Sequence, residues 1–177
     1  VASLLAAHKL YPQAIPVLSY DLNSNVDEFI TLYQAALPFV NRRDLNTRNV
    51  ERIILVDTQH AAKIRHVKAN TPVLIIDHHP ASKDFPPHVT LDCNIVCSTT
   101  TMLVERIRDQ RIAITSLEAT LMMLGIYADT GSLTYDSTTA RDARAAAWLL
   151  EQNAVLDTVR HFLTLHLDDV QTVLFDK

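Results

Sequence analysis

The chain has 177 residues, of which 48% are hydrophobic and 20% are charged, and its formal net charge is −4 at pH 7. This length suits one domain with a sizeable core, and the mixed composition excludes a disordered or collagen-like chain. The negative charge argues against broad, non-specific binding of duplex nucleic acid, but it leaves room for a local basic groove that takes a short anionic substrate.

The few glycines and cysteines limit the kinds of binding site that the chain can form. Neither of the two glycines, Gly125 and Gly131, lies in a glycine-rich phosphate loop, so side chains and metal ions would have to hold any phosphate. Cys93 and Cys97 have no second cysteine pair to complete a zinc site, and we expect reduced, buried thiols. With no apolar run of about 18 residues and no signal peptide, we expect a cytoplasmic protein that does not enter a membrane.

The start of the chain predicts a helix, a strand and a second helix. The apolar positions of residues 1–10 have helical spacing, and Pro12 closes that segment. Residues 15–20 predict a strand, and Asn25 is a candidate N-cap for a helix over residues 26–37. The aromatic side chains of this helix recur at helical spacing, so we expect them in the core rather than stacked on bases.

Two short aliphatic runs further along the chain end in chemically active side chains. Residues 52–56 predict a strand that ends at Asp57, and residues 72–76 predict a buried strand that stops at an Asp-His-His motif, residues 77–79. In an open parallel sheet, ligands bind at the carboxyl ends of the strands. We therefore expect these side chains to lie near one another at that edge of the sheet.

The second half of the chain predicts one strand, over residues 89–93, followed by helices. Thr115 and Glu118 have the spacing of a capping box, and the helix that they open leads to Asp129. Helices are expected over residues 102–110, 115–129, 138–150 and 157–165, and a further helix over residues 61–69 lies between the strands that end at Asp57 and at the Asp-His-His motif.

The Asp-His-His motif offers one anionic oxygen and two neutral nitrogens to a small volume. That donor set suits a divalent transition metal such as Mn, Co or Zn better than Ca or Mg. For an arbitrary pair of histidines, a polar loop after a core strand is the commoner interpretation. A second and a third acidic segment, at Asp57 and Asp129, favour the metal site.

These three segments resemble the motifs of the DHH phosphoesterase superfamily, which includes exopolyphosphatase-related proteins. The Val-Asp-Thr segment around Asp57 is similar to motif II, residues 77–79 to motif III, and the Ala-Asp-Thr-Gly-Ser-Leu segment around Asp129 to motif IV. The resemblance implies a three-layer α/β/α fold with a mainly parallel sheet. Because Val1-Ala2-Ser3 resembles the segment that follows motif I, the metal-binding residues of motif I would lie just upstream of residue 1. Either the chain is a fragment, or the protein has lost the first strand of the family.

The resemblance also implies a division into domains and a role for each motif. Residues 1–166 would form the DHH domain, and residues 167–177 a connector toward an absent C-terminal domain. Asp57, His78 and Asp129 would bind metal, in a site that holds two Mn²⁺ ions in the intact family, or Mg²⁺ or Co²⁺ in their place. Asp77 would orient a ligating imidazole, and His79 would lie near the scissile phosphate. Ser98 and Thr99, before a predicted helix, are weak candidates for substrate binding.

Within the superfamily, residues 56–59 and 128–150 look closest to DHH domains fused to a pair of CBS domains and a nucleotidyltransferase of the CCA-adding or poly(A) polymerase kind. The function implied is hydrolysis of phosphodiester or phosphoanhydride bonds in short oligonucleotides, nucleotides or polyphosphate. The alternative is a non-catalytic or regulatory domain of a larger RNA-processing nucleotidyltransferase. A sheet edge left open by the missing strand would also favour a homodimer.

Overall fold

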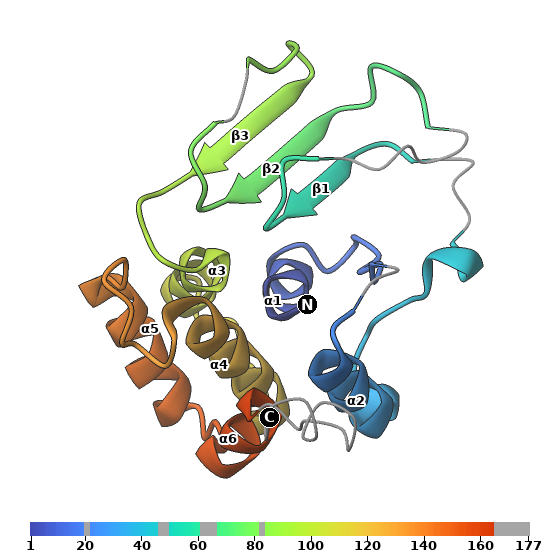
Figure 1. The fold of residues 1–177 in the computed structure, drawn as a ribbon. Helices are drawn as coiled ribbons and strands as arrows, with labels where there is room; N and C mark the ends of the chain where they lie inside the picture. Colours follow the sequence, from blue (N-terminus) through green and yellow to red (C-terminus); the bar gives the residue numbers. More distant parts are fainter. Residues whose placement is uncertain (20–21, 46–49, 61–66, 82–83, 165–177) are drawn as a thin grey trace, which may run out of the picture.

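Three short strands form a parallel sheet in the computed structural model, which describes residues 1–19, 22–45, 50–60, 67–81 and 84–164. The strands are β1 (Ile53–Val56), β2 (Val73–Asp77) and β3 (Val89–Cys93), and they lie side by side in that order. Parallel strands leave their carboxyl ends at one edge of the sheet, and the three arrowheads in Figure 1 point the same way. The predicted α/β fold with a mainly parallel sheet is confirmed.

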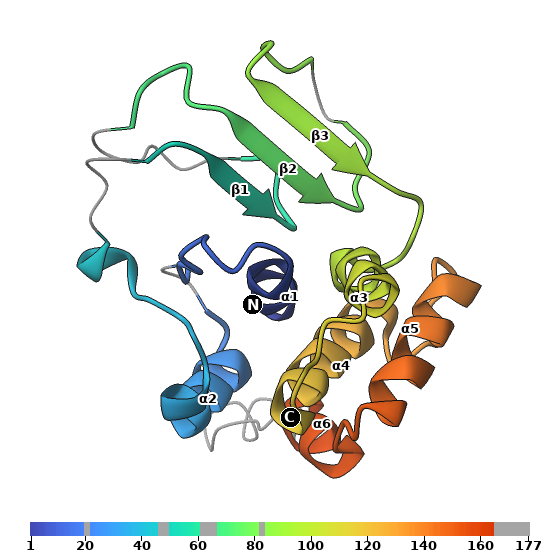
Figure 2. The same cartoon turned by 180° about the vertical axis from the view of Figure 1, so that it is seen from behind.

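The described part of the chain also contains six α-helices and two short 3₁₀-helices. They are α1 (Ala2–Leu10), α2 (Ser24–Tyr33), η1 (Gln34–Ala36), η2 (Arg42–Asp44), α3 (Thr99–Asp109), α4 (Ser116–Thr130), α5 (Ala140–Glu151) and α6 (Leu156–Leu163). In Figure 1, α1 and α3 lie below the strand ends, and Figure 2 shows the same division between sheet and helices from behind. None of the described helices is long and apolar enough to cross a membrane.

The hydrophobic core lies between the sheet and the helices. Alternate residues of a strand point to opposite faces, so Ile54 and Val56 of β1 share one face with Leu74 and Ile76 of β2. That face packs against a cluster built mainly from α1, α3 and α4, whose largest fully buried side chains include Leu5, Met102, Leu103, Ile107, Met122 and Met123. The core thus holds the carboxyl ends of β1 and β2 against the amino ends of α1 and α3.

Gly125 of α4 lies close to Ala2 of α1 and Thr100 of α3. A Cβ atom at this position would collide with the Cβ atom of Ala2 and would lie 2.9 Å from Oγ1 of Thr100. Both neighbours are buried parts of other helices, so neither can move aside freely. We expect Gly125→Ala to lower the free energy of unfolding by about 1–3 kcal/mol, the usual cost of overpacking a core. Urea denaturation measures the loss, and Ala128→Ser, at an exposed site of the same helix, should change stability by less than about 0.5 kcal/mol.

Two elements near the amino end differ from the sequence-based prediction. Residues 15–19 form a single bridge between Val17 and Val40 instead of a strand, and residue 20 lies outside the described residues. Pro16 has no N–H to extend the ladder, and only two backbone hydrogen bonds join the segments. Helix α2 ends at Tyr33 and continues as a 3₁₀ turn, so the predicted helix over residues 26–37 is too long.

The cap of α2 also differs. The N-cap is Asn23, whose side chain accepts a hydrogen bond from the N–H of Val26, while Asn25 donates to the carbonyl oxygen of Phe162. Sequence alone does not separate two asparagines placed two residues apart at a helix start. The tertiary contact with α6 decides which of them points back along the helix.

Further along the chain, most predicted elements are found, with shifted ends. The capping box of Thr115 and Glu118 is confirmed at the start of α4, and α3 begins three residues earlier than predicted. The predicted helix over residues 61–69 falls largely on residues 61–66, and the predicted connector on residues 167–177, which lie outside the described residues. Both cysteines are free, but only Cys97 is buried; Cys93, at the end of the edge strand β3, is exposed.

Candidate metal centre

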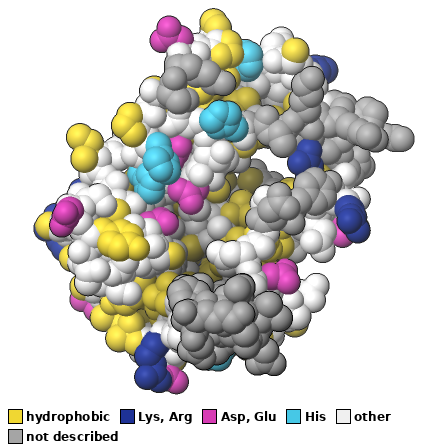
Figure 3. Space-filling model, in the orientation of Figure 1, with side chains coloured by type: hydrophobic (Ala, Val, Ile, Leu, Met, Phe, Trp, Pro, Cys, Tyr) yellow, Lys and Arg dark blue, Asp and Glu magenta, His cyan; other side chains and the backbone are white. Residues whose placement is uncertain are grey.

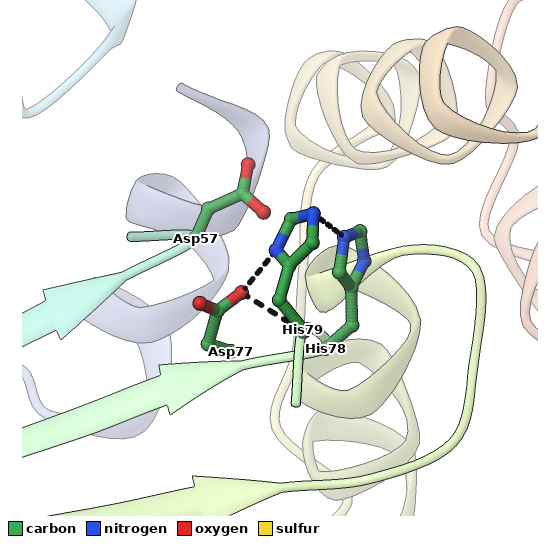
Figure 4. A group of neighbouring side chains, drawn as sticks. All are labelled: Asp57, Asp77, His78 and His79. Atoms are coloured by element: carbon green, nitrogen blue, oxygen red, sulfur yellow. Dashed lines mark hydrogen bonds and ion pairs between the residues drawn. The ribbon is translucent and has the colours of Figure 1, made fainter. Parts of the chain in front are cut away.

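The carboxyl ends of β1 and β2 bring four potential ligands together. Asp57 follows β1, Asp77 is the last residue of β2, and His78 and His79 come directly after it. One ligand atom from each of these four residues lies within 4.8 Å of the others. Figure 4 shows the Asp57 carboxylate pointing toward the His79 ring. The parallel register explains the meeting, because Val56 lies opposite Ile76 and the next residue of each strand is an aspartate.

Asp57 has an unusual backbone conformation. Its φ is 62°, in the left-handed region that few residues other than glycine, asparagine and aspartate adopt readily. The N–H of Asp57 still donates to the carbonyl oxygen of Ile76, and its Oδ1 accepts a hydrogen bond of 2.9 Å from the hydroxyl of Thr99. The turn aims the carboxylate away from the strand and toward the histidines.

Asp77 is 1% exposed and holds the ring of His79. Its Oδ1 accepts hydrogen bonds from Nδ1 of His79, at 2.9 Å, and from the backbone N–H of the same residue. Burial by itself would raise the pKa of Asp77, but these hydrogen bonds outweigh burial and leave the pKa below its ordinary value. Asp77 is therefore ionised at neutral pH, and it fixes Nδ1 of His79 as the protonated nitrogen.

The two histidine rings face each other through their Nε2 atoms, which lie 3.0 Å apart. When His79 is neutral and donates through Nδ1, its Nε2 carries a lone pair, so His78 must donate through Nε2. Nδ1 of His78 then carries a lone pair. Among the side chains of the described residues, it is the one buried polar atom without a hydrogen-bond partner. A buried acceptor without a partner lowers the free energy of unfolding, because it has given up its hydrogen bonds to water.

This donor set fits a divalent transition metal. Carboxylate oxygens and imidazole nitrogens both bind such ions. The clustered aspartates also supply negative charge that favours a cation. Asp57 and His78 are therefore placed to hold an ion, while Asp77 holds the ring of His79 beside them.

Asp129 approaches the same site from the last turn of α4, where Gly131 ends the helix in a left-handed conformation. Asp129 is not one of the four clustered residues. Burial raises the pKa of its carboxyl group; a hydrogen bond from Ser98 opposes that shift, and the charge of Asp57 adds to it. The carboxyl group also interacts electrostatically with His78. Asp129 thus lies beside the cluster, near enough to interact with Asp57 and His78.

Ser98 and Thr99, the two weak candidates, connect β3 to α3 and are both 0% exposed. Ser98 is the N-cap of α3 and hydrogen bonds Asp129. Thr99 donates to Asp57 and accepts a hydrogen bond from the backbone N–H of His78. Their hydroxyls therefore hold the carboxylates of the site, and contact with substrate stays a prediction.

Sequence reasoning missed Gln59, which is 8% exposed and joins the two strand ends. Its Nε2 donates to the carbonyl oxygens of His79, at 2.9 Å, and Pro80, at 3.0 Å, and its side chain also hydrogen bonds Asp77. The signal was a polar residue two positions after Asp57, where the predicted strand ends. Only the paired strands show that it reaches the neighbouring turn.

The site opens onto one face of the molecule. Figure 3 shows histidine and acidic side chains next to a hollow in this face. His79 is accessible there, with 64% of its side chain exposed, whereas Asp77 behind it is buried. A substrate from solvent would meet His79 and Asp57 before the other residues of the cluster.

A parallel α/β domain with aspartate and histidine side chains clustered at the carboxyl ends of its strands is the class that this fold and site define. The chain belongs to the DHH family: the family model described as "DHH family, N-terminal domain" matches residues 1–126. The resemblance inferred from the three motifs is therefore confirmed.

Two curated relatives are A-adding tRNA nucleotidyltransferases. The one from Geobacter sulfurreducens is 40% identical over 185 residues, covering 99% of this chain and 21% of that protein. The one from Aquifex aeolicus is 33% identical over 163 residues, covering 89% of this chain and 19% of that protein. The chain thus spans about a fifth of the length of these relatives, in agreement with the predicted likeness to nucleotidyltransferase fusions.

Solved structures show the same fold. A putative family II inorganic pyrophosphatase from Methanococcus jannaschii superposes with a TM-score of 0.67 at 19% identity, over 92% of this chain and 56% of that one. An exopolyphosphatase-related protein from Bacteroides fragilis gives a TM-score of 0.72 at 16% identity, over 99% of this chain and 55% of that one.

Proposed function

We propose that this chain is a metal-dependent phosphoesterase domain that hydrolyses phosphodiester or phosphoanhydride bonds with two ions of the Mn²⁺ type. The observation that carries the proposal is the group of Asp57, Asp77, His78 and His79, whose ligand atoms lie within 4.8 Å of one another at the carboxyl ends of two parallel strands. Membership of the DHH family and the fold shared with a putative pyrophosphatase support it.

In this proposal each side chain has a separate task. Asp57 and His78 would hold the ions together with Asp129, which approaches from α4. Ions bound there would lower the pKa of a water molecule and stabilise the charge that builds on the phosphoryl oxygens. His79 is exposed and would contact the phosphate; protonated on both nitrogens, it can donate through Nε2 to the leaving oxygen. Asp77 would stabilise that charged imidazole through its hydrogen bond to Nδ1.

We further propose that the chain forms the DHH domain of a larger protein that includes a nucleotidyltransferase. The support is the identity of 40% and 33% to proteins that carry this name and of which the chain covers about a fifth. Short oligonucleotides and nucleotides are then the first substrates to test, with polyphosphate next. Residues 1–166 would make up the domain.

The test combines metal binding with product release. The chain is stripped of metal with a chelator, titrated with Mn²⁺ by calorimetry, and incubated with short oligonucleotides, nucleotides or polyphosphate. We expect saturable Mn²⁺ binding and metal-dependent release of mononucleotide, phosphate or pyrophosphate, and neither in Asp57→Ala. A wild type that binds no Mn²⁺ and releases product no faster than Asp57→Ala would refute the hydrolase. Binding without release from any substrate would favour a regulatory domain.

A further inference from the structure

Asp142 is a buried carboxylate that the proposed chemistry does not use. It lies in the first turn of α5 and is 0% exposed. Burial by itself would raise its pKa, but hydrogen bonds from Thr101, Thr139 and Cys97 outweigh burial and lower it. A charged group buried inside a protein is retained only when such partners hold it. The arrangement of these partners indicates what Asp142 does.

The partners of Asp142 come from two directions. On the side of its own helix, Oδ2 accepts hydrogen bonds from the backbone N–H of Thr139, at 2.8 Å, and from the hydroxyl of that residue. The bond from the backbone N–H is one half of the capping box of α5; in the other half, the N–H of Asp142 donates to the Thr139 hydroxyl oxygen. On the other side, Oδ2 accepts from the backbone N–H of Cys97, at 3.2 Å, and Oδ1 accepts from the hydroxyl of Thr101, at 2.6 Å. Helix capping explains only the first pair of contacts.

Cys97 and Thr101 bound a short run that we call the hydroxyl segment, residues 97–101. All five of its residues are buried, with exposures between 0% and 9%. Asp142 accepts hydrogen bonds from the two ends of the segment. Between these ends, the hydroxyls of Ser98 and Thr99 hydrogen bond Asp129 and Asp57, respectively. The chain of contacts therefore runs from α5, through the hydroxyl segment, to two carboxylates of the metal centre.

We propose that Asp142 is a positioning residue of the metal centre, which fixes the hydroxyl segment so that Ser98 and Thr99 hold Asp129 and Asp57 in place. The proposal rests on the proposed function for the role of those carboxylates. Asp142 touches no ligand itself. Partners that orient ligands typically change metal affinity by about 10- to 100-fold, and an effect at the lower end is expected for a residue one step further away.

The fold does not depend on Asp142 alone to join α3 to α5. Arg141, the preceding residue, donates through Nε to Glu105 of α3 at 2.9 Å, and hydrogen bonding to Glu105 raises the pKa of the Arg141 guanidinium. Ala145, Ala146 and Leu149 of α5 also pack in the core. A variant that loses a hydrogen bond between Asp142 and the hydroxyl segment can therefore still fold, while the segment changes position.

The test replaces one buried threonine hydroxyl and compares it with a matched control. Thr101→Val removes the hydrogen bond to Asp142, and Thr120→Val removes a hydroxyl that bonds Ser116 and Val155 at the far end of α4. The two threonines are 0% and 1% exposed, and the substitution is the same. Mn²⁺ affinity is measured by calorimetry well below the melting temperature of each variant, and the ¹⁵N signals of the imidazoles of His78 and His79 are recorded without metal.

We expect Thr101→Val to weaken Mn²⁺ binding about 10-fold. It should also shift the imidazole signals of the metal-free chain. Thr120→Val should keep the Mn²⁺ affinity within about twofold of the wild type and leave the imidazole signals in place. Thr101→Ser, which keeps the hydroxyl, should restore both. Equal effects of Thr101→Val and Thr120→Val, or no effect of either, would overturn the proposal.

Two further cases are covered by the same design. If Thr101→Val does not fold, Asp142→Asn replaces it, because an amide cannot accept all the hydrogen bonds that the carboxylate accepts. If the wild type binds no Mn²⁺, the proposed function fails, and the imidazole signals of the metal-free chain decide the role of Asp142 by themselves.

Discussion

Asp57→Asn should weaken Mn²⁺ binding by more than about 100-fold while leaving the chain as stable as the wild type. Outer partners of metal ligands account for about 10- to 100-fold, and Asp57 is placed as a direct ligand. Asparagine has the same shape, accepts the hydrogen bond from Thr99, and tolerates the left-handed φ of 62° at this position. The substitution therefore removes the charge and keeps the turn. Calorimetric titration with Mn²⁺ and urea denaturation measure the two quantities.

Glu28→Gln is the matched control, because it removes one negative charge from an exposed position on α2. Its Mn²⁺ affinity should equal that of the wild type, which separates loss of a ligand from the change in net charge. If Asp57→Asn and Glu28→Gln bind Mn²⁺ equally well, Asp57 is no ligand, and the carboxylate cluster needs another explanation. A large loss of stability in Asp57→Asn would show that the carboxylate acts in folding instead.

Asp142→Asn should lower the free energy of unfolding by about 2–3 kcal/mol at pH 7, the usual contribution of hydrogen bonds to a charged group. Asp142 accepts four hydrogen bonds through its two oxygens, and an amide can offer one oxygen only. The folded-state pKa of Asp142 lies below that of the unfolded chain. Its contribution is therefore fully present above the unfolded pKa of about 3.9 and is lost as the pH falls through the folded pKa.

Urea denaturation of wild type and Asp142→Asn between pH 7 and pH 3 tests this dependence. The difference in stability between the two chains should be constant near neutral pH and shrink below about pH 4. Asp136→Asn, at an exposed position, should stay within about 0.5 kcal/mol of the wild type throughout. A difference that grows as the pH falls would mean that folding raises the pKa of Asp142 instead of lowering it.

Much of the fold follows from local patterns. The aliphatic runs before Asp57 and before the Asp-His-His motif predict β1 and β2, and the capping box of Thr115 predicts the start of α4. Such signals depend on residues close in sequence, so they can be read without the fold. The misplaced strand over residues 15–20 had a similar aliphatic pattern, but its neighbour in space supplied only one bridge.

The candidate site was likewise predicted only in part. The residue types of the cluster and their place at strand ends were predicted from sequence, as was the family. Three features were not predicted: Asp77 pairs with His79 instead of His78, Gln59 links the two strand ends, and Asp142 accepts hydrogen bonds from the hydroxyl segment. Each joins side chains whose directions depend on a turn or on a helix from another part of the chain.

By itself, the sequence determined which residues could bind a metal and that two of them end parallel strands, because these properties come from residue type and from hydrophobic runs. The tertiary structure decided which atoms meet. Hydrogen bonds and coordination act over about 3 Å, and the register of β1 with β2 and the packing of α3, α4 and α5 set distances on that scale.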